Sequence, residues 1–423
     1  MIKSLDAICA TSEYVKRQQI RFDDVSGLIL EVGDLKIPRD QIDYYFEDEK
    51  LLFAGMGDIH IHAREDVSGK NTYKEDFLSA LAAMKNGGVT HAGDMPNNPI
   101  PPVDNSSYEA KFKLGQKAHG CLWFYAGIGP DTRPLSYTVP YKVYMGPSIG
   151  ELFFKDLKTL DETLAHYRGQ HVSFHCEDPE ILDAHKNEGT HHDRRPVEAE
   201  SVATRDALML IEKYNLIGKL CHYSSDEGLR LIREARLRGV NVSIEVTPQH
   251  LYFDLEHLEA EDYKKFQMNP PIRHTKDREA LKAALLNGEI QYLATDHAPH
   301  TQEEKDKGTS GLTGLDTYAG FVTWLISQGY KPELIAKVAS ENPGDFHNQF
   351  LPSWKKLNPD LAKYGSGLGY LKENFYANFT IVSLNKPQTV LTSHLKTKVG
   401  HSPFLGVTFP GQLDSLFLGG RKV

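Results

Sequence analysis

The chain has 423 residues, of which 40% are hydrophobic and 25% are charged, and its formal net charge is −9. These proportions are those of an ordinary soluble globular protein, and the lysines and arginines are spread out rather than gathered as on a nucleic-acid-binding surface. No apolar run approaches the ~18 residues of a membrane span, and residues 1–19 lack the apolar core of a signal peptide. We therefore expect a cytoplasmic protein with no nucleic-acid or membrane partner.

The two ends of the chain contain short β-like pieces. Residues 1–50 include GLILEVGDLKI, and residues 346–423 include YANFTIVSL, QTVLTSH and LFLGGRKV. Neither end holds enough strands for a stable sheet of its own. We predict that 1–50 and the later part of 346–423 meet in one small β domain, beside a larger domain formed by residues 51–345.

Between the two ends, short apolar runs alternate with amphipathic segments. The runs cover residues 51–61, 89–95, 121–128, 140–145, 171–176, 217–223, 240–246 and 290–296. Strand–helix alternation repeated eight times predicts a parallel sheet closed into a (β/α)8 TIM-like barrel, so the fold class is α/β. The chief alternative is an open doubly wound sheet, but no G-x-G-x-x-G follows an early strand. Thr72 and Glu75 are predicted to form a capping box before the helix that ends at Gly87.

The segment AGMGDIHIHARED (54–66) carries two histidines and an arginine at every second position. On a strand, side chains at i and i+2 share a face, so His60, His62 and Arg64 would line one surface. Taken alone, such a segment is explained more simply as a polar surface strand than as part of a functional site. The positions of other metal-competent residues decide between these two explanations.

Six such residues fall in or at the C-terminal ends of predicted barrel strands, the end where these barrels build active sites. They are His60, His62, Lys142, His175, His222 and Asp296. Imidazole and carboxylate suit zinc, and the set exceeds the three protein ligands usual for one catalytic zinc, which favours two metals about 3.5–4 Å apart. A lysine could join them only as a carbamate; otherwise Lys142 would be a lysine extending from a strand end. Cys176 and Cys221 are expected to face away from this site.

Ten segments, in order along the chain, resemble those of one family. They are GMGDIHIHARED, GDMPNN, YKVYMGPSIGELF, HCED, RRPVEAE, CHYSS, EVTPQHL, MNPPIR, ATDHAPHTQEEK and GHSPFLG. With these motifs the chain resembles the dihydroorotases, in the cyclic amidohydrolase branch of the amidohydrolase superfamily. The combination of H-x-H-x-R with DHAPHTQEEK is the most specific part of this resemblance.

The resemblance implies roles for individual residues. The six residues at the strand ends would hold two Zn²⁺ ions, bridged by a carboxylated Lys142 and a hydroxide. Arg64, Asn97 and His300 would bind the substrate carboxylate, while Asn269 and the backbone of Gly311 would contact the ring. Asp296 would also carry the proton in catalysis, and Ser148 would lie on a loop over the substrate. His191 and His192 are expected to be loop residues rather than ligands.

The activity that the resemblance implies is the reversible cyclisation of N-carbamoyl-L-aspartate to (S)-dihydroorotate and water, a step of pyrimidine biosynthesis. Dihydropyrimidinase, hydantoinase and allantoinase are the enzymatic alternatives, because they open similar cyclic amides with the same metal centre. Their substrates lack the ring carboxylate that Arg64 would bind. A catalytically silent scaffold homologue is the alternative outside enzymes, although such proteins lose ligands that this chain keeps. The sequence leaves open whether the chain forms a homo-oligomer.

Overall fold

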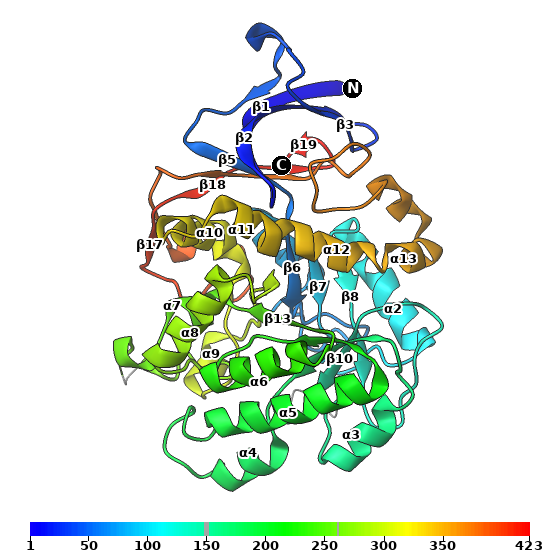
Figure 1. Cartoon of the computed structure of the whole chain (residues 1–423), viewed down its shortest axis with the longest axis vertical. Helices are drawn as coiled ribbons and strands as arrows, with labels where there is room; N and C mark the ends of the chain where they lie inside the picture. The colour runs from blue at the N-terminus through cyan, green and yellow to red at the C-terminus, as the bar shows by residue number, and fades with distance from the viewer. Residues whose placement is uncertain (148–151, 260–261) are drawn as a thin grey trace.

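The chain folds into a barrel of parallel strands with a second sheet at one end of it (Figure 1). The structure is a computed structural model, and it describes residues 1–147, 152–259 and 262–423. Among these residues, no helix is long and apolar enough to cross a membrane. The α/β barrel with an added sheet confirms the predicted fold class.

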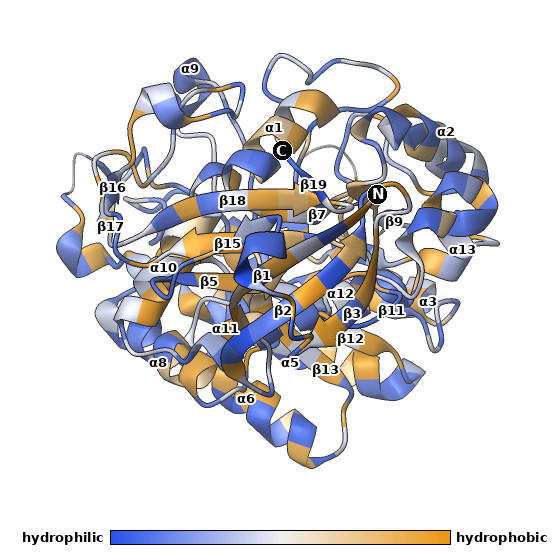
Figure 2. Cartoon of the chain, turned by 90° about the horizontal axis from the view of Figure 1, so that it is seen from above, coloured by the Kyte–Doolittle hydropathy of each residue, from blue (hydrophilic) through white to orange (hydrophobic). Residues whose placement is uncertain are grey.

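Strands from both ends of the chain make the second sheet, as predicted. Its order is β19-β18-β15-β5-β1-β2-β3, with β4 beside β1. The bounds are Ile2–Ala10 (β1), Val15–Asp23 (β2), Leu28–Gly33 (β3), Tyr44–Tyr45 (β4), Lys50–Ala54 (β5), Phe379–Ser383 (β15), Gln412–Leu418 (β18) and Arg421–Lys422 (β19). Polar and apolar residues alternate in the last part of β2 (Figure 2), from Gln19 to Asp23, where the strand buries Ile20 and Phe22. Phe22 packs against Phe379 from the other end of the chain, so each end supplies part of one core.

In the part of the chain that the structure describes, nine strands build the barrel, and every one lies within an apolar run predicted from the sequence. Their bounds are Met56–Ile61 (β6), Val89–Asp94 (β7), Leu122–Phe124 (β8), Ala126–Ile128 (β9), Tyr141–Tyr144 (β10), His171–His175 (β11), Ile217–Leu220 (β12), Val242–Val246 (β13) and Tyr292–Leu293 (β14). β8 and β9 are two halves of the third run, interrupted at Tyr125. The barrel closes where the amide of His62 donates to the carbonyl of His297 at 2.7 Å. This closure places the first and last ligand-bearing segments side by side.

Helices cover the outside of the barrel, so its strands are buried on both faces and read as apolar runs. The helices are Phe77–Asn86 (α1), Asn105–Gly115 (α2), Leu157–Leu164 (α3), Pro179–His185 (α4), Val197–Tyr214 (α5), Asp226–Leu237 (α6), Pro248–Tyr252 (α7), Thr275–Leu286 (α8), Gln302–Asp306 (α9), Tyr318–Ser327 (α10), Pro332–Ala336 (α11), Asn342–Asn348 (α12) and Leu351–Leu357 (α13). α10 contacts β18 and α12 contacts β6, so the last helices join the barrel to the second sheet.

Two local predictions are wrong. Residues 51–61 do not form one strand, because the chain leaves the second sheet after β5 and enters the barrel at β6, with Gly55 between them. A Cβ at Gly55 would lie 2.5 Å from atoms of Asn378 and Thr90, so only glycine fits this crossing. Helix α1 is capped by Asp76, whose carboxylate accepts from the amides of Leu78 and Ser79, and not by Thr72. The boundaries proposed for the domains, after residues 50 and 345, stay a prediction.

Candidate active site

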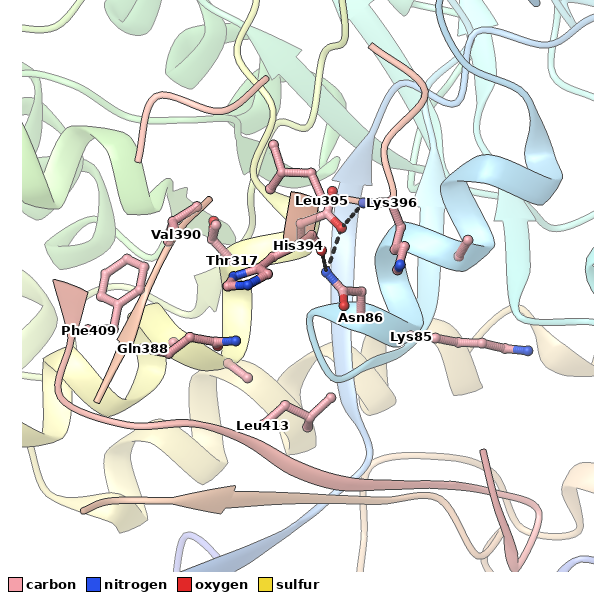
Figure 3. A pocket seen from close by; sticks show the side chains of 14 residues that line it. Lys85, Asn86, Thr317, Gln388, Val390, His394, Leu395, Lys396, Phe409 and Leu413 are labelled. Atoms are coloured by element: carbon pink, nitrogen blue, oxygen red, sulfur yellow. Dashed lines mark hydrogen bonds between the residues drawn. The ribbon is translucent and has the colours of Figure 1, made fainter. Parts of the chain in front are cut away.

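Two cavities of similar volume differ in their chemistry. The first, of about 440 Å³, lies between α1, α10 and the C-terminal segments (Figure 3). Its polar groups bond to one another: the side-chain amide of Asn86 donates to Asp316 at 2.7 Å and to the carbonyl of His394 at 2.9 Å. Asp316 also accepts from the amide of Lys396. These groups are already satisfied, so this cavity offers no converging reactive atoms.

The second cavity, of about 400 Å³, lies at the C-terminal ends of the barrel strands. It is lined by ten of the residues singled out in the sequence: His60, His62, Arg64, Asn97, His175, His222, Asn269, Asp296, His300 and Gly311. Lys142 is fully buried behind this lining, and Ser148 lies outside the described residues. Segments scattered over 250 residues of sequence therefore meet in one place, as the barrel topology predicts.

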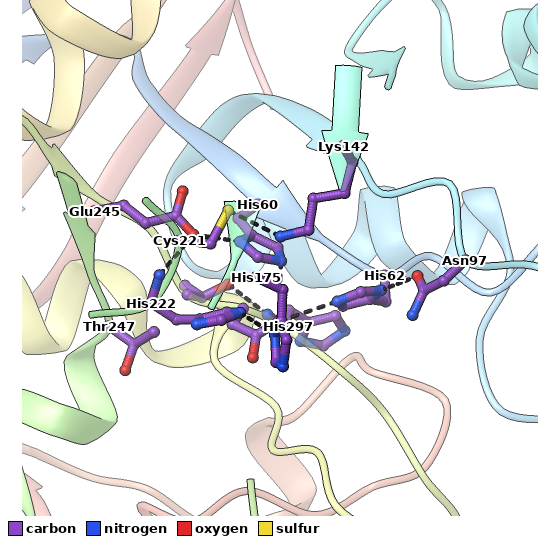
Figure 4. A network of polar contacts seen from close by, with 12 residues as sticks. His60, His62, Asn97, Lys142, His175, Cys221, His222, Glu245, Thr247 and His297 are labelled. Atoms are coloured by element: carbon purple, nitrogen blue, oxygen red, sulfur yellow. Dashed lines mark hydrogen bonds and ion pairs between the residues drawn. The ribbon is translucent and has the colours of Figure 1, made fainter. Parts of the chain in front are cut away.

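His60, His62 and Asp296 form the first group of converging atoms (Figure 4). The Nε2 atoms of His60 and His62 lie 3.2 and 3.0 Å from the same carboxylate oxygen of Asp296. The Nδ1 of His60 contacts Glu245, and that of His62 lies 2.8 Å from Oδ1 of Asn97. Because both of these partners are acceptors, each Nδ1 carries the proton and each Nε2 turns a lone pair toward Asp296.

The protonation of these groups favours a bound cation. Burial, above all, lowers the pKa of His60 and of His62 well below the usual range, so both imidazoles are neutral near pH 7. Burial also raises the pKa of Asp296 to about 7, because its carboxylate has lost water. Two nitrogen lone pairs and a carboxylate oxygen at this spacing are suited to a divalent metal such as zinc.

His175 and His222 form the second group. Nδ1 of His175 lies 3.0 Å from Nε2 of His222, while Nε2 of His175 lies 2.8 Å from the carboxylate of Glu177. The hydrogen bond to Glu177 leaves a lone pair on Nδ1 of His175. Among the described residues, Nδ1 of His222 has no hydrogen-bond partner. A metal between the two rings would bind both facing nitrogens, so this pair also fits a metal site.

Lys142 lies beneath the histidines and has no carboxylate partner among the described residues. Its Nζ donates to Sγ of Cys221 at 2.8 Å and lies 5.2 Å from the centre of the Tyr144 ring. The prediction that Cys221 faces away from the site is therefore wrong, although this cysteine is buried as expected. A buried lysine without a counter-ion is a candidate for neutralisation by carboxylation.

Three charged residues around the ligands were missed in the sequence. Glu245 is fully buried, forms an ion pair with Lys219, and accepts the amide of His222 at 3.0 Å as well as contacting His60. Glu177 is fully buried and contacts both His175 and Arg195. For Glu245 and Lys219 the available signal was a charged residue inside a mainly apolar strand, as in VSIEV and IGKL, whereas Glu177 follows its strand and gave no such signal.

The residues predicted to bind the substrate carboxylate lie on one side of the cavity. Arg64 is 3% exposed, and its Nε donates to the carbonyl of Pro299 at 3.3 Å. Its guanidinium also lies 3.1 Å from Nε2 of His300. No described carboxylate forms an ion pair with it, although a buried guanidinium normally has one. Asn97 has a further role that was not predicted, because its amide oxygen contacts His62.

Asn269 and Gly311 lie on another wall of the cavity. His191, expected to be a loop residue only, brings its Nε2 to 3.0 Å from the carbonyl of Met268 and 3.1 Å from Oδ1 of Asn269. The amide of Gly311 donates to the carbonyl of Gln267 at 2.9 Å. The Gly311 carbonyl is therefore the backbone group that can still meet a ring N–H, because an oxygen has two lone pairs.

The backbone is strained at three of the cavity residues. Arg64, His222 and Asp296 have φ values of +61°, +35° and +47°, in a region that non-glycine residues seldom adopt. Such conformations cost about 1–3 kcal/mol each and persist where the surrounding structure imposes them, often at functional sites. All three follow the hydrogen-bonded part of a barrel strand, where the chain turns to point the side chain into the cavity.

Comparison with known proteins agrees with this geometry. No family model matches the chain. A dihydroorotase of Geobacillus thermodenitrificans is 30% identical over 403 residues, which cover 88% of this chain and 87% of that protein. The chain belongs to the dihydroorotase family. Other members of the family include the dihydroorotases of Pyrococcus furiosus, 28% identical over 92% of this chain and 84% of that one, and of Halalkalibacterium halodurans, 28% identical over 97% and 94%.

Solved structures of hydantoinases have the same fold as this chain. An L-hydantoinase from Arthrobacter aurescens has a TM-score of 0.84, with 21% identity and coverage of 100% of this chain and 96% of that one. A D-hydantoinase from Thermus sp. has a TM-score of 0.81, with 18% identity and coverage of 99% and 94%. At these identities the likeness concerns the fold alone.

Proposed function

We propose that this chain is a zinc-dependent dihydroorotase that interconverts N-carbamoyl-L-aspartate and (S)-dihydroorotate in the cytoplasm. The observation that carries the proposal is Arg64, a buried cation that lines the metal cavity without a described carboxylate partner. The substrate brings the missing carboxylate. Hydantoin, dihydrouracil and allantoin have none, so they would leave this guanidinium uncompensated.

In the proposed site, His60, His62 and Asp296 would hold one Zn²⁺, His175 and His222 would hold a second, and a carboxylated Lys142 would contribute to binding both. When bound, the pair of ions supplies an activated water and polarises the amide carbonyl. The family membership and the converging nitrogen and oxygen atoms support this assignment. A silent scaffold protein would have no reason to keep six such groups, with Glu245 and Glu177 orienting two of them.

The chain's own residues position the substrate and move the proton. Arg64 and His300, 3.1 Å apart, bind the ring carboxylate, and Asn269 and the Gly311 carbonyl meet the ring. The carboxylate of Asp296 accepts the proton released in the attack on the amide and returns it to the departing ring nitrogen. In the direction of ring closure, Asp296 acts in the reverse order.

A substrate panel tests the proposal. Purified protein, with its zinc content measured on the same sample, is assayed with dihydroorotate, dihydrouracil, hydantoin and allantoin. We expect two zinc ions per chain and a preference for dihydroorotate. Preference for a ring without a carboxylate would assign the chain to the hydantoinase-type activity instead, and a metal-free inactive protein would support the scaffold alternative.

A further inference from the structure

Lys305 is a buried lysine outside the metal centre. It lies on α9, directly after the DHAPH segment, and is 3% exposed. Its Nζ donates three hydrogen bonds, to the carbonyls of Gln267 and Thr309 at 3.0 Å each and of Gly311 at 2.9 Å. An ammonium has three N–H groups, so these three carbonyls use all of them.

The three carbonyls replace a counter-ion. Among the described residues, no carboxylate forms an ion pair with Lys305, so three backbone carbonyls are the groups that stabilise its charged form, while burial lowers the pKa of this lysine to about 7. Charge-assisted hydrogen bonds are the stronger kind, and a buried donor fixes the position of each acceptor it reaches. Lys305 therefore imposes a specific spacing on the segments that carry these carbonyls.

Those segments form one wall of the cavity. Asn269 follows Gln267 by two residues, and Thr309, Ser310 and Gly311 also line the cavity. Gly311 has little freedom of its own: its φ is +141°, and a Cβ there would lie 2.6 Å from the carbonyl oxygen of Ala298. This wall therefore packs against Ala298 of the DHAPH segment and is hydrogen-bonded to Lys305.

His191 makes a second connection across the same wall. Its Nε2 lies within 3.4 Å of Ser310 Oγ and 3.1 Å of Asn269 Oδ1. This contact comes from the loop before α5, and His191 is half-buried. Both residues connect the 267–269 and 309–311 segments: His191 through the side chains of Asn269 and Ser310, and Lys305 through backbone carbonyls.

We propose that Lys305 is a positioning residue for substrate binding, which sets the Gly311 carbonyl and the Asn269 side chain at the spacing that the cyclic substrate requires. The inference rests on the proposed function for its substrate, but the mechanical role of Lys305 does not depend on it. Loss of Lys305 should loosen this wall and leave the metal ligands in place, because none of its three partners is a metal-binding residue.

The test compares Lys305→Met with Lys307→Met. Methionine keeps most of the length and removes all three donors, while Lys307 is an exposed lysine on the same segment, paired only with Glu303. For each variant, zinc content, KM and kcat for dihydroorotate, and amide hydrogen exchange of residues 266–269 and 309–312 are measured. Lys305→Gln, which keeps one donor group, is prepared alongside.

We expect full zinc content, a KM raised about tenfold or more with a smaller loss in kcat, and exchange in both segments faster by about tenfold, as for lost positioning contacts. Lys305→Gln should fall between Lys305→Met and the wild type, and Lys307→Met should match the wild type. Unchanged KM and exchange in Lys305→Met would overturn the proposal, as would loss of zinc or of the fold in both Lys305 variants. If the wild type does not turn over dihydroorotate, the proposed function fails, but the exchange rates still decide the role of Lys305.

Discussion

The side-chain oxygen of Asn97 lies 2.8 Å from Nδ1 of His62, so a residue expected to bind substrate also orients a proposed metal ligand. Asn97 follows β7, whereas His62 follows β6, and the contact joins the loops after two neighbouring strands. It fixes the proton on Nδ1 and leaves Nε2 facing Asp296 at 3.0 Å. In the proposed site, substrate recognition and metal binding would therefore share a residue.

Replacing Asn97 with alanine should weaken metal binding as well as substrate binding. Loss of a hydrogen-bond partner of a metal-binding histidine typically lowers metal affinity by about 10–100-fold. The measurement is zinc affinity by competition with a chelator, with Asn187→Ala, an exposed asparagine, as the matched control. An Asn97→Ala variant with unchanged zinc affinity would show that the contact does not orient His62.

Lys142→Ala should lose zinc and activity together. The reason is that a carboxylated Lys142 would supply the side chain shared by both ions, and its buried amine has no described carboxylate partner. A short carboxylic acid added to Lys142→Ala should restore part of both, because it can occupy the space of the carbamate. Mass spectrometry of the native protein, or ¹³C NMR after growth with labelled bicarbonate, tests the modification directly. A fully active, zinc-loaded enzyme with an unmodified Lys142 would contradict this role.

Two effects of Glu245 should be separable by mutation: its effect on stability, through Lys219, and its effect on zinc affinity, through His60. Glu245→Leu leaves Lys219 buried without its partner, which we expect to lower the free energy of unfolding by about 3–5 kcal/mol. Adding Lys219→Met removes that buried charge and should recover most of the loss. Zinc affinity should stay low in the double variant, because His60 has still lost its acceptor. Chemical denaturation and chelator competition measure the two effects, and recovery of both together would contradict this account.

His171 should contribute to acid sensitivity away from the active site. Burial lowers the pKa of His171 to about 4, against about 6.5 for an unfolded chain, and its ring packs against Phe350 with centroids 5.1 Å apart. The folded state thus binds fewer protons, so stability is lost as the pH falls from 6.5 toward 4 and is unaffected above 6.5.

His171→Phe keeps the aromatic contact and removes the titrating group. Because His171 is partly exposed, we expect metal-free His171→Phe to lose about 1–3 kcal/mol less free energy of unfolding than metal-free wild type between pH 6.5 and 4. Urea denaturation at several pH values measures the difference. Equal losses in the two proteins would show that His171 already titrates normally in the folded state.

The sequence was sufficient to predict the barrel and the location of its site. Buried parallel strands appear as apolar runs, and polar residues at the ends of such runs have one rim on which to meet. Features set by contacts distant in sequence were missed. Gly55 marks a crossing between two sheets only because Asn378 packs against it, and Glu75 is used by His297 and Thr397 rather than by the helix that follows it.

The rule that side chains alternate along a strand also could not predict which way the side chains at the site point. Cys221 was placed on the opposite face from His222 by strict alternation, but the chain leaves β12 at Leu220 and His222 adopts a φ of +35°. Alternation therefore no longer applies there, and Sγ of Cys221 reaches Lys142. Glu245 was passed over because its strand is otherwise apolar, and its ion pair with Lys219 exists only once β12 and β13 are adjacent.

In the proposed function, Arg64 selects a substrate with a carboxylate. Removing a buried charge-assisted contact costs about 1.5–3 kcal/mol, so Arg64→Ala should lower kcat/KM for dihydroorotate by about tenfold to over a hundredfold. Arg64→Lys should restore only part of this loss, because a point charge cannot reproduce the planar pair of donors. Zinc content should stay unchanged in both variants, since Arg64 contacts Pro299 and His300 rather than a metal-binding residue.

The most direct measurement is the ratio of kcat/KM for dihydroorotate to that for dihydrouracil, in the wild type and in Arg64→Ala at equal zinc content. The two rings differ by the carboxylate that Arg64 would bind. We predict a large ratio in favour of dihydroorotate in the wild type, and a fall of about tenfold or more in Arg64→Ala, with dihydrouracil turnover little changed. A wild type that prefers dihydrouracil, or a ratio that Arg64→Ala leaves intact, would contradict the assignment of this chain as a dihydroorotase.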